Sequence, residues 1–130
     1  MHKLSNEKVI KIKPAFEDER GVIVNILEEP VSHIAILTSK KGSVRANHYH
    51  PEQVQYAYLI SGSYESVSKD IKDENAKIEK ITVKPGDLII TPPMIAHAWN
   101  VLEDSVMLNI TTGARENSNF EEHTKKYKLI

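Results

Sequence analysis

The chain has 130 residues, with 17 Lys and Arg against 18 Asp and Glu, which gives a formal net charge of -1. Hydrophobic residues make up 40% and charged residues 27%, a balance that excludes a disordered chain and fits about one globular domain. A nearly neutral chain lacks the broad positive field that attracts nucleic acid or an anionic membrane, so we expect neither as a partner. The absence of cysteine excludes disulfides, thiolate catalysis and iron–sulfur clusters.

The start of the sequence gives an expectation about location. Residues 1–13 are polar and rich in lysine, without the apolar core of a signal peptide. No apolar run approaches the roughly 18 residues that a membrane helix needs. We therefore expect a cytoplasmic protein.

The hydrophobic pattern has a period of two along most of the chain, which is typical of β-strands. Short runs of this kind, separated by Gly and Pro, indicate an all-β sandwich or barrel. Residues 116–128 are polar and are expected to form a short helix or a tail. Strands are predicted over residues 8–13, 21–27, 32–38, 54–61, 63–68, 76–83, 87–91, 97–101 and 105–111.

Three histidines and one glutamine stand out as candidate metal ligands. His48 and His50 are two residues apart, and such residues point to the same face of a strand. Gln55 and His97 each lie near the start of another predicted strand. If these strands pair, three imidazoles and an amide oxygen meet inside the barrel. Imidazole suits zinc, iron, nickel or manganese, so we predict a divalent metal at this place.

A purely structural role is the alternative for these histidines. Two rings on one face repel each other once both are protonated. A β-protein would seldom keep the pair of His48 and His50 inside without a metal, a proton or a substrate to share. This electrostatic cost favours a functional role.

The residues around the pair resemble the first motif of the cupin family. That motif is Gly, five residues, His-x-His, three or four residues, Glu, six residues and Gly. Gly42 through His50, followed by Gln55 and Gly62, fits every spacing, with Gln55 in place of the usual glutamate. A neutral amide leaves the site one unit more positive than a carboxylate would. Glu52 is near enough to replace Gln55 as a ligand if the turn after Pro51 is irregular.

The second cupin motif is matched by Gly86, Pro92 and His97. Met94 replaces a common glycine there, and Val101 replaces the usual asparagine. The resemblance implies a cupin double-stranded β-helix, which is a jelly-roll barrel. We expect one cupin domain over residues 1–130, with the first motif at 42–62 and the second at 86–101.

A narrower resemblance concerns cupins that epimerise or isomerise nucleotide-linked 4-keto sugars. Residues 45–50 resemble their Arg-Gly-x-His-Tyr segment, with Ala46 in place of glycine, and residues 18–21 are similar to their early Asp-x-Arg-Gly element. The resemblance implies that His48 is a catalytic base and that Arg20 and Arg45 contact the sugar nucleotide, Arg20 from a neighbouring subunit. No residue of this chain is matched to the family's acid tyrosine or to the aspartate that orients its base.

The chemistry of such a reaction agrees with a histidine base. Removal of a proton beside a sugar ketone leaves an enolate, and an imidazole changes its charge near neutral pH. Metal binding and base catalysis compete for His48, because a nitrogen that ligates a metal cannot also accept a proton. Trp99 shares the strand parity of His97, so it either lines the cavity or packs in the core. Strand parity places Tyr56 and Tyr58 on the face opposite Gln55, which disfavours them as catalytic acids.

We predict an isomerase or epimerase of a nucleotide-linked keto sugar that also binds zinc, manganese, iron or nickel. One alternative is a metal-dependent oxygenase or lyase that uses open positions on a three-histidine site. Another is a non-catalytic module that binds a small ligand. The exposed edges of a small barrel often pair across a two-fold axis, so we expect a homodimer.

Overall fold

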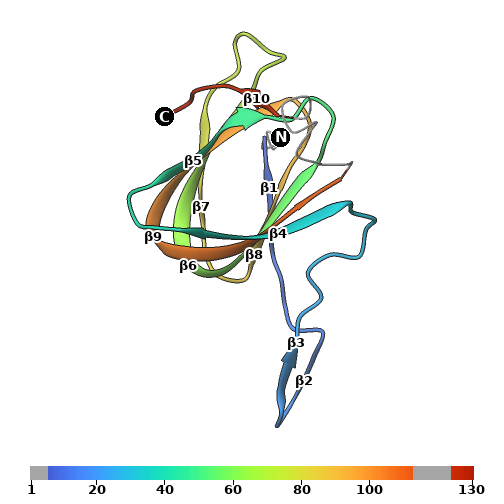
Figure 1. Cartoon of the computed structure of the whole chain (residues 1–130). Helices are drawn as coiled ribbons and strands as arrows, with labels where there is room; N and C mark the ends of the chain where they lie inside the picture. Colours follow the sequence, from blue (N-terminus) through green and yellow to red (C-terminus); the bar gives the residue numbers. More distant parts are fainter. Residues whose placement is uncertain (1–5, 113–123) are drawn as a thin grey trace, which may run out of the picture.

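The computed structural model describes residues 6–112 and 124–130, and its strands curl into a barrel (Figure 1). No helix occurs in these residues, so the predicted all-β fold is confirmed. The strands are β1 (Lys8–Lys11), β2 (Phe16–Asp18), β3 (Gly21–Ile23), β4 (His33–Ser39), β5 (Val44–Tyr49), β6 (Gln55–Asp70), β7 (Glu79–Val83), β8 (Asp87–Thr91), β9 (Ile95–Thr111) and β10 (Lys125–Lys126).

Two long strands, β6 and β9, hold the barrel together. They pair with each other from Gln55↔Thr111 to Asp70↔Ile95. The first part of β6 also pairs with β8, and its second part with β7. In the same way, β9 pairs first with β5 and then with β4. Each long strand therefore pairs with the other long strand and with two shorter strands along its length.

The break predicted between the strands at 54–61 and 63–68 is a bend within β6. The register between β6 and β9 shifts repeatedly from Leu59 to Tyr64. Gly62 has a φ of +93°, and a Cβ built on it would lie 2.7 Å from the Cα of Ser105. Only glycine fits this close approach of two backbones.

The strands predicted over residues 97–101 and 105–111 are one strand, β9, and the prediction missed β2, β5 and β10. The remaining strands differ from their predicted bounds at their ends. β3 stops at Ile23 instead of continuing to residue 27, and β7 begins at Glu79 instead of residue 76. β8 has the predicted bounds. Of the segment predicted to be a short helix or a tail, residues 116–123 lie outside the described part. Residues 124–130 contain β10, which pairs with β5, so the described part of that segment is not helical.

Apolar side chains pack in two clusters on opposite faces of the sheet. Tyr56 and Tyr58 belong to the second cluster, on the face away from Gln55, as strand parity predicts. The buried members of the first cluster are Ala57, Leu59, Tyr64, Val83, Ile89, Trp99, Val101 and Met107, and those of the second are Tyr56, Leu88 and Ile110.

Among the described residues, no helix is long and apolar enough to span a membrane.

A β-bulge in β5 sets which of its side chains meet β9. Ala46 pairs with Ala98, but the next registered pair is His48 with His97, so Asn47 is the extra residue. Ala46 and Asn47 both have left-handed backbones, with φ values of 69° and 57°. Without the extra residue, the same register would place Asn47 opposite His97. Because residues directly opposite in an antiparallel pair share a face, the bulge brings His48 and His97 together.

The bulge predicts a stabilising substitution at Ala46. A left-handed backbone costs alanine about 1–2 kcal/mol, and glycine loses about 0.4–1 kcal/mol more chain entropy on folding. We therefore expect Ala46→Gly to raise the free energy of unfolding by roughly 0.5–1 kcal/mol, measured by urea denaturation. Ala98→Gly is the matched control and should destabilise the protein, because Ala98 has no left-handed φ and is buried. A loss of stability in both variants would contradict this account of the bulge.

Candidate functional site

The three histidines predicted from the sequence meet at one place in the barrel. One ligand atom from each of His48, His50 and His97 lies within 4.8 Å of the others. The His48 ring centroid is 4.9 Å from that of His50 and 4.8 Å from that of His97, and the His50 and His97 centroids are 6.0 Å apart. His50 and His97 are buried, whereas His48 is partly exposed. The predicted convergence of the three rings is therefore observed.

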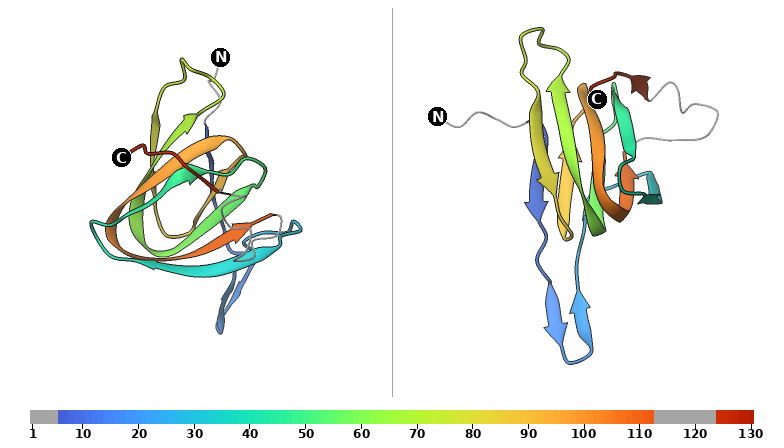
Figure 2. Two further views of the ribbon diagram at one scale, coloured as in Figure 1. Left: turned by 45° about the horizontal axis from the view of Figure 1, so that its top comes forward. Right: turned by 90° about the vertical axis from the view of Figure 1, so that its left-hand side faces the viewer.

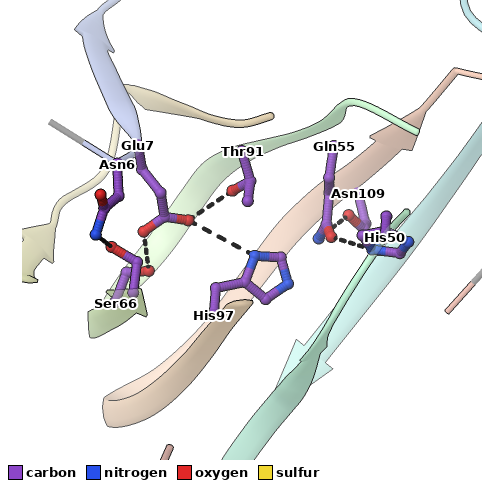
Figure 3. Close-up of polar contacts among 9 residues, drawn as sticks. Asn6, Glu7, His50, Gln55, Ser66, Thr91, His97 and Asn109 are labelled. Carbon is purple, nitrogen blue, oxygen red and sulfur yellow. Dashed lines mark hydrogen bonds and ion pairs between the residues drawn. The ribbon is translucent and has the colours of Figure 1, made fainter. Parts of the chain in front are cut away.

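Gln55 turns its amide oxygen toward this cluster. The Nε2 group of His50 donates a hydrogen bond to Oε1 of Gln55 at 2.8 Å. The amide nitrogen of Gln55 in turn donates to Oδ1 of Asn109 at 2.8 Å, which fixes the orientation of the amide (Figure 3). Thr124 Oγ1 lies 3.4 Å from the other nitrogen of His50. Glu52 is exposed and does not belong to the histidine cluster.

On the opposite side, His97 faces a buried carboxylate that the sequence did not reveal. Nδ1 of His97 lies 3.6 Å from Oε2 of Glu7, and both side chains are fully buried. Ser66 donates to Oε1 of Glu7 at 2.6 Å, and Thr91 donates to Oε2 at 2.5 Å. Figure 3 shows Glu7 on one side of His97, and His50 with Gln55 on the other.

The donor set fits a divalent cation in chemistry and nearly in spacing. Imidazole nitrogens and an amide oxygen are ordinary ligands for such ions. Two ligand atoms of a tetrahedral zinc lie about 3.3 Å apart at bond lengths of about 2.0–2.1 Å. The widest separation of 4.8 Å therefore requires two of the rings to move together by about 1.5 Å. His48, His50, His97 and Gln55 would hold the ion, and Nε2 of His50 would then have to give up the proton that it donates to Gln55.

A small cavity gives access to this cluster from one side. It has a volume of about 210 Å³, and its lining includes His48, Gln55, Trp99 and Arg45. His50 and His97 are not part of the lining. Arg45 also borders an open groove of about 710 Å³, whose lining includes Ser39, Ser61 and Ser105. His48 is thus the histidine of the cluster that lines the cavity.

Arg45 and Trp99 are held in defined positions at the cavity. The Arg45 guanidinium donates to Ser39 Oγ at 2.8 Å and to the backbone oxygen of Thr38 at 2.7 Å. Trp99 is 2% exposed, and its ring centroid lies 5.0 Å from that of Tyr64 and 5.5 Å from that of His97. Trp99 therefore both packs in the core and lines the cavity, so its two predicted roles coincide.

Arg20 does not join this site within one copy of the chain. It lies in the hairpin formed by β2 and β3, which projects from the barrel at the end away from β10 (Figures 1 and 2). β10 pairs with β5 at His48, so the hairpin and the histidines lie toward opposite ends. The Arg20 side chain is bound to Asp18 at 2.7 and 3.0 Å. These hydrogen bonds lower the pKa of Asp18.

Tyr64 is a second buried polar residue that the sequence did not mark. Burial raises the pKa of Tyr64 well above its ordinary value, and the charges of Glu7 and Asp87 raise it further. Its hydroxyl has no hydrogen-bond partner among the described residues. Neither Glu7 nor Tyr64 carried a local signal, because a single Glu or Tyr in a β-pattern is normally a surface or packing residue.

Solved structures with the same fold include two epimerases and a ketoisomerase. A dTDP-4-dehydrorhamnose 3,5-epimerase from Sulfolobus tokodaii matches with a TM-score of 0.74 at 22% identity, over 95% of this chain and 78% of that chain. The 3'-monoepimerase ChmJ from Streptomyces bikiniensis, in complex with dTDP-quinovose, matches with a TM-score of 0.73 at 18% identity, over 88% and 69% of the two chains. The sugar 3,4-ketoisomerase QdtA from Thermoanaerobacterium thermosaccharolyticum matches with a TM-score of 0.71 at 18% identity, over 89% and 87%. At these identities, the likeness establishes the fold.

The sequence comparisons agree with the barrel. A search of curated protein sequences finds no match. The family model described as Cupin domain matches residues 35–111, which is more than half of the chain and includes both histidine motifs. The protein therefore belongs to the cupin domain family.

Proposed function

We propose that this cupin is an isomerase or epimerase of a nucleotide-linked keto sugar, with His48 as the catalytic base. The observation that carries the proposal is the placement of His48 in the cavity wall beside Arg45 and Trp99. The similar structures named above support the substrate class, because they are epimerases and a ketoisomerase, and those with bound molecules hold dTDP-sugars or TDP. A fold hosts many functions, so the site and not the barrel alone supports this choice.

The residues that line the cavity would have separate roles in such a reaction. A neutral imidazole of His48 would accept the proton from the carbon beside the keto group. In an isomerisation it would return the proton to the neighbouring carbon, whereas an epimerisation would need a second group to deliver a proton to the opposite face of the same carbon. Arg45 is charged at any working pH and offers a planar pair of donors that suits a diphosphate. Because Arg45 lines both the cavity and the groove, the sugar would fit in the cavity while the nucleotide lies in the groove.

A second candidate function follows from the donor set. His48, His50, His97 and Gln55 fit a divalent metal, which supports a metal-dependent oxygenase or lyase. When bound, the ion would act as a Lewis acid on a substrate oxygen. The two candidates exclude each other at His48, because a nitrogen that binds a metal cannot serve as the base.

We also propose a homodimer in which Arg20 reaches the cavity of a second copy. Arg20 lies on the hairpin of β2 and β3, which projects from the barrel at the end away from the histidines (Figure 2). Three apolar side chains of this hairpin are more than half exposed, as are two on the outer face of β4. Such apolar surface is stabilised when a partner covers it. The exposed side chains are Phe16 at 52%, Val22 at 51%, Ile23 at 58%, Ile34 at 62% and Ile36 at 71%.

The same packing supports one cupin domain over the whole chain. The N-terminal strand β1 pairs with β8 inside the region that matches the family model. The C-terminal strand β10 pairs with β5 in the same region. Both ends of the described chain are thus built into one barrel.

The first prediction concerns exchange of a carbon-bound proton. With TDP-4-keto-6-deoxyglucose in deuterated water, we expect the wild-type protein to incorporate deuterium next to the keto group, measured by mass spectrometry. His48→Ala should slow this exchange by about 10²–10⁴-fold, since that is the usual contribution of a general base. His33→Ala is the matched control and should exchange like the wild type, because His33 lies on β4 outside the cluster.

Three outcomes of this experiment separate the hypotheses. Exchange that persists in His48→Ala removes His48 as the base. Tight binding without exchange in the wild type favours the non-catalytic binding module. No binding and no exchange with any activated keto sugar contradicts the proposed function.

The second prediction concerns the metal. If the cluster holds a divalent ion, elemental analysis of the purified protein should find about one equivalent of zinc, manganese, iron or nickel. His50→Ala should lose this metal, because it removes one ligand, whereas His33→Ala should keep it. A wild-type protein that stays metal-free after incubation with these ions would exclude the oxygenase or lyase and leave the base mechanism.

A further inference from the structure

We infer that Glu7 is a positioning residue that fixes the orientation and the tautomer of His97. The inference deepens the proposed function, because it states what holds the third ring of the cluster in place. It also applies to the metal-dependent alternative, since either chemistry needs His97 to turn one defined nitrogen toward His48 and His50.

The first argument is the burial of the carboxylate. Glu7 is 1% exposed and His97 is 0% exposed. A buried carboxylate is strongly destabilising unless hydrogen-bond donors replace its water. Ser66 and Thr91 supply two donors, one to each carboxylate oxygen. Oε2, which accepts from Thr91, is also the oxygen that lies 3.6 Å from Nδ1 of His97.

The second argument is the identity of the atom that faces Glu7. If Nδ1 carried a lone pair, two acceptors would face each other in a site without exposure to water, which is unfavourable. If Nδ1 carries the proton, its N–H has the negative carboxylate 3.6 Å away, which is an electrostatic contact and lies beyond hydrogen-bond distance. The arrangement therefore selects the tautomer with the proton on Nδ1, and Nε2 keeps its lone pair. Figure 3 shows this second nitrogen on the side of the ring away from Glu7.

The third argument is that the segment carrying Glu7 is itself fixed. The backbone N–H of Asn6 donates to Glu79 at 2.7 Å, and the Asn6 amide lies 3.4 Å from Ser68 Oγ. Immediately after Glu7, β1 pairs with β8 from Lys8↔Ile90 onward. These contacts hold Glu7 on both sides along the chain. A carboxylate held in this way can impose an orientation on a ring that would otherwise rotate.

The consequence concerns the other rings of the cluster. Glu7 fixes His97 from one side, and Gln55 with Asn109 fixes His50 from the other. His97 then presents an unprotonated Nε2, which can ligate a metal or accept a hydrogen bond from a bound substrate. We therefore assign Glu7 to the support of the site, although it lies 41 positions before His48 in the sequence.

The test reads the tautomer of His97 directly in the metal-free protein without substrate. Protein labelled with ¹⁵N-histidine is studied by long-range ¹H–¹⁵N NMR, and the His97 signals are assigned by their loss in His97→Gln. In the wild type we expect one tautomer, protonated on Nδ1. Glu7→Gln should lose this single tautomer and show a mixture, because its amide can either accept from the ring or donate to it.

Glu79→Gln is the matched control, because it removes a carboxylate that contacts the same N-terminal segment but not His97. It should keep the wild-type tautomer. A wild-type His97 protonated on Nε2, or a Glu7→Gln spectrum identical to that of the wild type, would overturn the inference. The wild-type measurement decides the question even if Glu7→Gln fails to fold. Because no keto sugar is present, failure here is distinguishable from failure of the exchange experiment.

Discussion

The site depends on one irregularity in the sheet, the extra residue that Asn47 adds to β5. It shifts the pairing with β9 by one position and places His48 directly opposite His97. Since side chains alternate along a strand, a regular pairing would put Asn47 in that position and turn His48 to the other face. Two left-handed residues are needed to make the shift, and asparagine tolerates that backbone better than alanine does. The structure thus accepts local strain at the point where the histidines meet, as functional sites often do.

Around this point, buried polar groups contact two of the three rings, each in a different way. Glu7 faces His97, and Gln55 accepts a hydrogen bond from His50 while Asn109 holds its amide (Figure 3). Buried polar groups are strongly destabilising when unsatisfied, so such chains of hydrogen bonds leave few alternative arrangements. His48 is the member of the cluster that lines the cavity. The barrel therefore supplies rigid support on the inside and one histidine that a ligand can reach.

The sequence predicted the site better than it predicted the fold details around it. The spacing of His48 and His50 and the two cupin motifs were enough to predict that His97 joins them. The bulge at Asn47 was not predicted, because nothing in a residue string marks which strand carries an extra residue. The bend at Gly62 was predicted as a break between two strands, because glycine is common both at turns and at bends within a strand. Glu7 could not be found at all, because its contact with Thr91 spans 84 positions and a lone glutamate carries no pattern.

The convergence of the three imidazoles is the claim on which the proposed base, the metal site and the role of Glu7 all depend. Nuclear Overhauser effects between ring protons of the wild-type protein test it most directly, because they report distances between the side chains without substitution, metal or substrate. The account predicts cross-peaks that connect the His48 ring with both the His50 and the His97 rings, whose centroids lie 4.9 and 4.8 Å away. Cross-peaks from His97 to core residues such as Trp99 alone, with none to His48, would contradict it.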